Sequence, residues 1–141
     1  MKKNALFLMV IILLSACQKK KAQLKRIDGT WQVELVRVLD GEGFTFYDSL
    51  PSGIISISSD ELKMNGRIDF NYSHFGINQV QDSFVVDQAY FTINEKGDHL
   101  SLIRSTDTID VRLLSTSKKN LEFEYYDYHQ YRLRRFVLRK L

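Results

Sequence analysis

Apolar and polar residues alternate with a period of two from Thr30 onward. Trp31, Val33 and Leu35 alternate with polar residues, and residues 121–125 repeat the pattern. Such alternation is typical of antiparallel strands with one buried face, and no stretch of helical length keeps a 3.6-residue period. We predict a single all-β domain over residues 27–141, an antiparallel up-and-down β-barrel of roughly 8–10 strands. The strands are expected near residues 30–38, 54–58, 61–64, 67–74, 84–93, 99–104, 108–115, 120–127 and 131–139.

The parity of the apolar residues predicts how some strands connect. Around Met64-Asn65-Gly66, a three-residue loop with Gly66 in the left-handed conformation pairs Leu62 with Ile68, whereas a two-residue turn would separate them. The same parity pairs Leu113 with Leu121 across the connection from Ser115 to Lys119. In the last strand Tyr131 and Leu133 are out of phase with Phe136 and Leu138, which predicts a bulge at residues 134–135.

The first 16 residues have the composition of a secretory signal peptide. Lys2 and Lys3 precede a ten-residue apolar run at positions 5–14, which is shorter than the ~20 residues of a transmembrane helix. The run ends in Leu14-Ser15-Ala16-Cys17, which resembles the lipobox of bacterial lipoproteins. The resemblance implies that Cys17, the only cysteine, becomes the mature N-terminus, carries acyl chains such as palmitate, and has no free thiol.

Lipidation would anchor the protein to a membrane, since more than one acyl chain makes anchoring stable. By resemblance to lipoproteins without an acidic sorting signal, Gln18 indicates the outer membrane, facing the periplasm, with the cell surface as the alternative. The same segment could instead be an ordinary signal peptide with an incidental cysteine, or a signal anchor.

Positive charge is concentrated directly after Cys17. The chain has a formal net charge of +3, yet residues 27–141 contain 13 Lys or Arg against 17 Asp or Glu. Residues 17–26 are therefore predicted to be a basic, solvated tether, either lying on anionic lipid headgroups or serving as a soluble spacer. Nucleic acid is not expected as a partner. The basic residues of this tether are Lys19, Lys20, Lys21, Lys25 and Arg26.

The first predicted strand opens with Gly29-Thr30-Trp31, which resembles the G-x-W motif of the lipocalins. In that family the last strand supplies an Arg that packs on the Trp, and here Arg132, Arg134 or Arg135 could do so. Thr106-Asp107-Thr108 partly echoes the family's T-D-Y motif but lacks its aromatic residue. The resemblance implies a lipocalin-like barrel that binds a small hydrophobic molecule, or one with a structural or inhibitory role.

The resemblance also implies where a ligand would bind. The connection at residues 40–53 falls where lipocalins place a lid over the barrel mouth. Its Phe44, Phe46 and Tyr47 could close on a ligand or form another strand packed on the barrel. Trp31 is a further ligand-binding candidate, although a structural role in packing is the main expectation.

Catalytic and metal-binding motifs are not evident. His74, His99 and His129 are scattered without metal-ligand spacing, and no phosphate-binding or hydrolase motif occurs. We therefore expect no cofactor, no metal and no enzymatic activity.

The densest aromatic and polar segment is residues 125–131, in which Tyr126, Tyr128 and His129 are candidates for ligand contacts. Tyrosine pairs stacked across a hairpin are the structural alternative. Two functions follow: a membrane-anchored barrel that binds a small hydrophobic molecule or an envelope component, or a non-enzymatic accessory or inhibitor protein with surface contacts to protein or carbohydrate.

Overall fold

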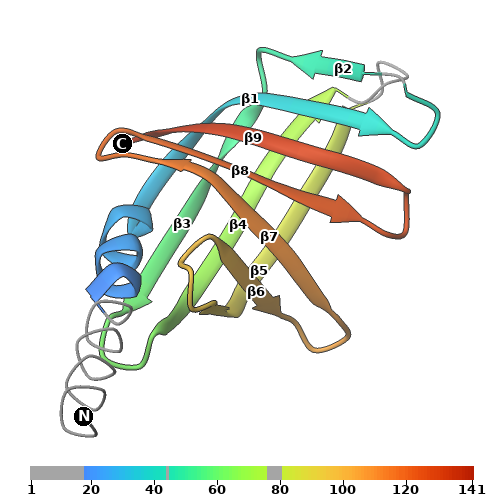
Figure 1. Cartoon of the computed structure of the whole chain (residues 1–141). Helices are drawn as coiled ribbons and strands as arrows, with labels where there is room; N and C mark the ends of the chain where they lie inside the picture. Colours follow the sequence, from blue (N-terminus) through green and yellow to red (C-terminus); the bar gives the residue numbers. More distant parts are fainter. Residues whose placement is uncertain (1–17, 44, 76–80) are drawn as a thin grey trace, which may run out of the picture.

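The computed structural model describes residues 18–43, 45–75 and 81–141, apart from the side chains of residues 82, 84 and 86–88. Residues 18–27 are helical, and nine strands are described after them (Figure 1). The strands are β1 (Gly29–Asp40), β2 (Thr45–Asp48), β3 (Ser52–Asp60), β4 (Asn65–Phe75), β5 (Gln81–Ile93), β6 (His99–Ile103), β7 (Thr108–Thr116), β8 (Asn120–Asp127) and β9 (Arg132–Lys140).

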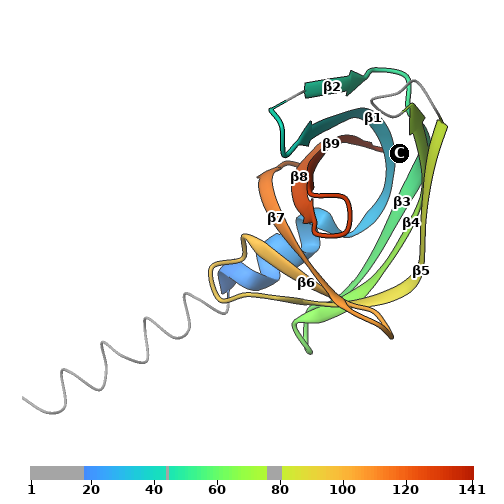
Figure 2. The ribbon, with the colours of Figure 1, turned by 90° about the vertical axis from the view of Figure 1, so that its right-hand side faces the viewer.

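Eight of these strands form a closed antiparallel barrel. From β3 to β9 each strand pairs with the next one in sequence, and β1 closes the ring by pairing with both β3 and β9. Figure 2 looks along the barrel and shows this ring, with the helix at its far end. The short β2 pairs with the second half of β1. The predicted fold class, an antiparallel up-and-down barrel of the kind found in lipocalins, is confirmed.

The alternation seen in the sequence places one face of each strand in the core. On β8, Leu121, Phe123 and Tyr125 are buried, while Glu122 and Glu124 between them are only partly buried, as predicted. Phe123 and Phe136 stack with ring centroids 5.0 Å apart. Aromatic rings from facing strands therefore fill the middle of the barrel.

A bulge in β1 changes which residues face inward. The pairing with β9 shifts between Val33 and Leu35, and a bulge of this kind moves the inward face by one residue. Trp31 and Val33 point into the core before it, whereas Val36 does so after it, fully buried. The predicted inward position of Leu35 was therefore wrong, and Leu35 is only half-buried.

The β3–β4 hairpin differs from its prediction. Residues 61–64 form the turn instead of a strand, and Met64 adopts a positive φ of 55°. Leu62 lies exposed in this turn, and Ile68 pairs with Ile57. Gly66 lies within β4, where an added Cβ would come within 2.6 Å of the Phe91 ring. Gly66 therefore provides space for a core side chain and does not form the turn.

Two predictions about the C-terminal strands were also wrong. Leu113 pairs with Phe123 and not with Leu121, because β7 continues to Thr116, which is the partner of Leu121. The pairing of β8 with β9 runs from Asp127↔Arg132 to Asn120↔Arg139 without a shift, so the bulge predicted at 134–135 is not there. Tyr131 is out of phase because it lies before β9, with a positive φ of 51°.

The segment predicted to be a solvated tether is helical from Gln18 onward and covers one end of the barrel. Leu24 and Ile27 are fully buried there, because residues three apart lie on the same face of a helix. Gln23 donates to Thr116 Oγ1 at 3.0 Å, and the Asp28 carboxylate accepts the Ser59 N–H at 2.7 Å. Two apolar residues are too weak a periodic signal to predict a helix. Among the described residues, no helix has the length and hydrophobicity to span a membrane.

Trp31 connects this helix to the barrel. Its ring is fully buried, and its Nε1–H donates to the Ile27 carbonyl at 2.8 Å. The cation on the ring is Lys140, whose Nζ lies 5.2 Å from the ring centroid. It is not one of the three arginines considered from the sequence, because the register sets Lys140 opposite Trp31. Trp31 is therefore a packing residue at the closed end.

Replacing Leu24 by Ala should destabilise the protein by about 2–5 kcal/mol, because it leaves a cavity between the helix and the barrel. Urea denaturation measures this change in the free energy of unfolding. Lys25→Ala on the exposed side of the same helix is the matched control and should change it by no more than about 0.5 kcal/mol. Equal unfolding midpoints for the two variants would contradict the burial of Leu24.

Candidate functional site

A pocket of about 420 Å³ opens at the end of the barrel away from the helix. This end carries the turns that follow β6 and β8, whereas β1 begins and β9 finishes at the helix end. The volume lies within the ~300–1,000 Å³ usual for small-molecule sites. The lining residues are Ser83 on β5, Arg104, Asp107, Thr108 and Ile109 around the β6–β7 turn, Tyr125–Gln130 at the β8–β9 turn, and Arg134 on β9.

Tyrosines form the aromatic part of the lining. Tyr125 faces inward on β8 and stacks on Phe136, with ring centroids 5.8 Å apart. Tyr126 and Tyr128, partly and largely exposed, meet edge to face at 4.9 Å. The Asp127 carboxylate shapes the turn between these rings by accepting the backbone N–H of His129 at 3.1 Å. The structure thus brings the three candidate residues Tyr126, Tyr128 and His129 to one pocket.

A buried cation forms the inner polar part of the site. Arg134 is only 3% exposed, because it continues the inward face of Phe136 and Leu138 on β9. Its Nη2 donates to Gln130 Oε1 at 2.5 Å, and its Nε lies 3.6 Å from Asp127 Oδ2. On the other side, Nη1 lies 3.4 Å from Nε2 of the buried His74. Such partners offset the cost of removing a guanidinium from water.

Sequence reasoning assigned Arg134 to a bulge and did not predict its contribution to this site. The spacing of two between Arg134, Phe136 and Leu138 was the available signal. It was not recognised because a charged residue in a core position is uncommon. His74 likewise lies on the inward face of β4, stacked 5.8 Å from Tyr72.

An ion pair forms the rim of the pocket. Arg104 Nε donates to Asp107 Oδ1 at 2.6 Å, and a second contact joins Nη2 to Oδ2. The hydrogen bond from Arg104 lowers the pKa of Asp107, and the charge of Arg104 lowers it further. The same bond raises the pKa of Arg104. The charges of the rim are therefore paired with each other, leaving the tyrosines and Ile109 as the apolar contact surface.

The other sequence candidates do not line this pocket. Trp31 lies at the opposite end of the barrel. The predicted lid segment forms β2, where Phe46 is half-buried and Tyr47 is exposed beneath the Arg37 guanidinium, 5.4 Å from the ring centroid. The strand alternative for this segment is therefore the one observed. Phe44 and Cys17 lie outside the described residues.

The chemistry available at the site is noncovalent binding of a molecule with an apolar or aromatic part. Tyrosine faces and Ile109 supply the apolar contacts, while Gln130, Arg104 and Asp107 supply hydrogen-bonding groups. Within the described parts of the chain, no three His, Cys, Asp or Glu side chains are grouped as metal ligands would be.

Comparisons of the sequence with protein-family models and with curated proteins found no match. Solved structures share the barrel architecture at 11% sequence identity. A de novo designed fluorescence-activating β-barrel has a TM-score of 0.49 over 84% of this chain and 96% of its own. A deswapped triple mutant of bovine odorant binding protein has 0.46 over 84% and 74%. The S-type phycobiliprotein lyase CPES of Guillardia theta has 0.45 over 82% and 88%.

Replacing Arg134 by Ala should destabilise the protein by about 3–5 kcal/mol, because it leaves the partly buried Asp127 carboxylate without its cation. Thermal or urea unfolding measures the loss. Arg112→Ala is the control, since the exposed Arg112 pairs with Glu124 on the barrel exterior at 3.3 Å and should cost about 1 kcal/mol or less. Similar losses in the two variants would mean that the buried cluster is not a structural unit.

Arg104→Gln should raise the pKa of the Asp107 carboxyl toward its ordinary value of 3.8. Because folding lowers the pKa of Asp107 below its ordinary value of 3.8, its carboxylate stabilises the folded state fully at pH values above 3.8. This contribution is lost as the pH falls through the lowered pKa. Carboxyl NMR titration measures the shift. Asp98, whose pKa His99 and Asn94 lower to about 2, is the internal control and should not move. An unchanged Asp107 titration would contradict the ion pair.

Proposed function

We propose that this protein is a lipid-anchored, non-enzymatic binding protein whose barrel holds a small, largely apolar molecule at its open end. The observation that carries the proposal is the pocket of about 420 Å³ lined by the tyrosine segment of β8 and its turn. Small barrels of about eight strands accommodate either packed side chains or one small ligand. Here the packed aromatic core lies beneath the pocket, and the ligand would occupy the mouth.

The polarity of the pocket narrows the class of ligand. Because Arg104 pairs with Asp107 and Arg134 contacts Asp127, an anionic ligand would have to compete with carboxylates that are already in place. A neutral amphipathic molecule would not have to compete with these carboxylates. Its flat or branched apolar part would contact Tyr126, Tyr128 and Ile109, and its hydroxyl or carbonyl group would meet Gln130 or the rim pair.

Anchoring is the second part of the proposal. The sequence resemblance of Leu14-Ser15-Ala16-Cys17 to a lipobox supports acylation of Cys17. With Gln18 at the next position, we propose the outer membrane as the location and the periplasm as the compartment that the barrel faces.

Surface recognition of another envelope protein or a carbohydrate is the alternative function. It is favoured by the exposure of the rim aromatics, since Tyr128 is 75% exposed. Exposed aromatic rings beside hydrogen-bonding groups also suit such partners.

Native mass spectrometry of the protein extracted from its own envelope tests both functions. A stoichiometric, noncovalent mass of a few hundred daltons (on the order of the pocket's capacity) is the expected result. A bound polypeptide in place of this mass would support the alternative. The covalent mass on the peptide that begins at Cys17 reports acylation separately.

A defined apolar probe tests the pocket directly. Binding of the neutral fluorophore N-phenyl-1-naphthylamine should weaken by about tenfold or more in the Tyr126→Ala, Tyr128→Ala double variant. Ser83→Trp should also weaken it, by filling the pocket. Tyr90→Ala is the matched control, because Tyr90 is exposed on β5 and contacts Arg67 away from the pocket. Equal affinities in all four proteins would rule out this pocket as the site.

A further inference from the structure

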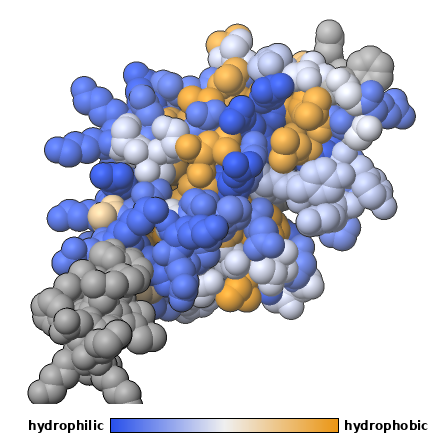
Figure 3. All heavy atoms as spheres, in the orientation of Figure 1, coloured by the Kyte–Doolittle hydropathy of each residue, from blue (hydrophilic) through white to orange (hydrophobic). Residues whose placement is uncertain are grey.

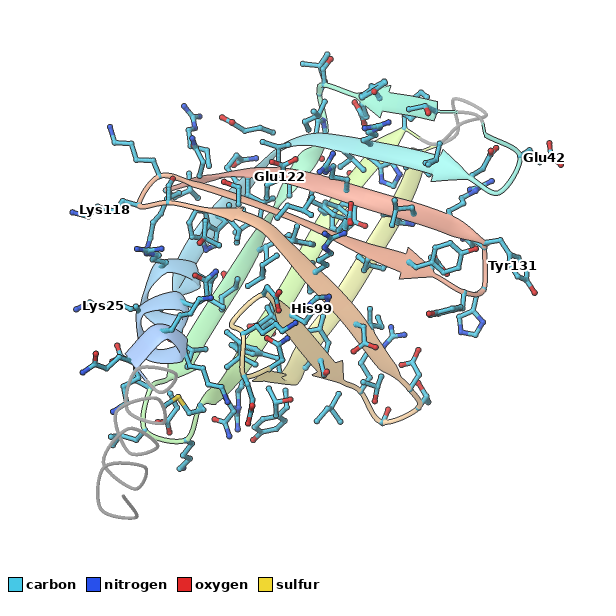
Figure 4. All side chains as sticks on the ribbon, in the orientation of Figure 1. Lys25, Glu42, His99, Lys118, Glu122 and Tyr131 are labelled. Atoms are coloured by element: carbon cyan, nitrogen blue, oxygen red, sulfur yellow. The ribbon has the colours of Figure 1, made fainter. Side chains whose placement is uncertain are left out.

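The end of the barrel opposite the pocket carries a basic groove. Residues 18–27 cross this end with Leu24 and Ile27 turned into the barrel, which leaves Lys25 and Arg26 exposed. The β7–β8 turn brings Lys118 to the same end, and β9 finishes there with Lys140. Figure 4 shows Lys25 and Lys118 at the end away from Glu42 and Tyr131. Hydrophilic residues also gather around this end in Figure 3.

These side chains enclose a groove of about 500 Å³. Its lining is Ala22, Lys25, Arg26, Lys118 and Lys140, and it contains no carboxylate among the described residues. Four cationic residues contributed by the helix, a turn and the last strand are thus held together by the tertiary fold. Like charges gathered around one groove repel one another, so an anion placed among them would be stabilised.

The charge of the groove is not compensated from within the described parts of the protein. There, Lys25, Arg26 and Lys118 form no ion pair, and the Lys140 ammonium donates to the uncharged Asp28 carbonyl at 2.6 Å. By contrast, Arg139 on β9 pairs with Glu34 at 2.8 Å, and Arg135 pairs with Glu122 at 3.0 Å. The groove therefore has positive charge available for a partner.

We propose that this groove binds the phosphate groups of anionic lipid headgroups, so that the helix end of the barrel lies on the bilayer. The choice of a bilayer as partner rests on the proposed acylation of Cys17. Cys17 directly precedes the first described helical residue, and one residue of chain spans no more than about 3.6 Å. An acyl anchor at Cys17 therefore brings the helix, and with it the groove, to the headgroups.

This orientation decides what the pocket faces. The pocket and the groove lie at opposite ends of the barrel, so docking of the groove points the pocket mouth away from the membrane. Ligand would then be exchanged with the aqueous compartment, and the pocket would not extract lipid from the bilayer on which the protein sits.

Energy transfer from Trp31 to dansyl-labelled lipid headgroups tests the docking. Trp31 is the only tryptophan, and it lies beside Lys140 at the groove end. The purified full-length protein is mixed with vesicles of neutral phosphatidylcholine, or of phosphatidylcholine with phosphatidylglycerol. Transfer should be greater with the anionic vesicles and fall as salt is added, because headgroup attraction is screened.

Lys25→Glu with Lys118→Glu should remove the difference between the two kinds of vesicle. Each Lys or Arg near an anionic surface strengthens binding about fivefold, so losing two weakens it by about 25-fold or more. Arg37→Glu with Arg132→Glu changes the net charge equally but toward the opposite end of the barrel, and should retain most of the transfer. Circular dichroism confirms that both variants keep the β-sheet spectrum.

Three outcomes would overturn the proposal. The first is equal transfer to neutral and anionic vesicles, and the second is an equal effect of the two double variants. The third is loss of transfer in millimolar inorganic phosphate but not in sodium chloride of the same ionic strength, which would identify a site for free phosphate. Intact mass reports acylation independently, so an unacylated protein that still prefers anionic vesicles would refute the anchor and not the docking.

Discussion

The pairing of β1 with β9 is the contact on which the rest of the structure depends. It joins the first and last strands from Trp31↔Lys140 to Asp40↔Arg132 and converts an open sheet into a closed ring. The bulge between Val33 and Leu35 lets β1 pair with β9 along its whole length while Val36 and Val38 still face the core. A shift of one residue in this register would turn the inward side chains of β9 outward.

The same register gives the two ends of the barrel different chemistry. At one end Lys140 lies over Trp31, and the helix covers the core through Leu24 and Ile27. At the other end Arg134 is carried inward to meet Asp127, Gln130 and His74. Between them the stacked rings of Phe123 and Phe136 separate the ends. A closed, basic end and an open, tyrosine-lined end therefore follow from one strand pairing.

The paired charges at the open end reflect a general cost. An isolated guanidinium in the interior would be strongly destabilised, so Arg134 is accommodated only with polar partners from β4, β8 and the turn. Arg104 and Asp107 on the rim satisfy each other in the same way. Neutralisation within the site leaves aromatic faces as its main contact surface, whereas the cations of the groove lie at the other end of the barrel.

The sequence by itself determined most of the strands and the inner faces of those without a bulge, because the two-residue period of a strand is a local property. Alternation at residues 121–125 predicted the buried face of β8, and the tyrosine-rich segment at 125–131 supplied candidate contact residues that line the pocket. The lipobox resemblance is likewise local, and it predicts acylation of Cys17, which lies outside the described residues.

Only the tertiary structure decided which residues meet. The burial of Leu24 requires a barrel end that residues far along the chain build, and Arg134 approaches His74 across 60 positions of sequence. Bulges and register shifts, such as those in β1 and β7, change the partner of each residue without changing the pattern of the sequence. Local periodicity contains no information about such long-range contacts, and the pocket and the groove are both built from them.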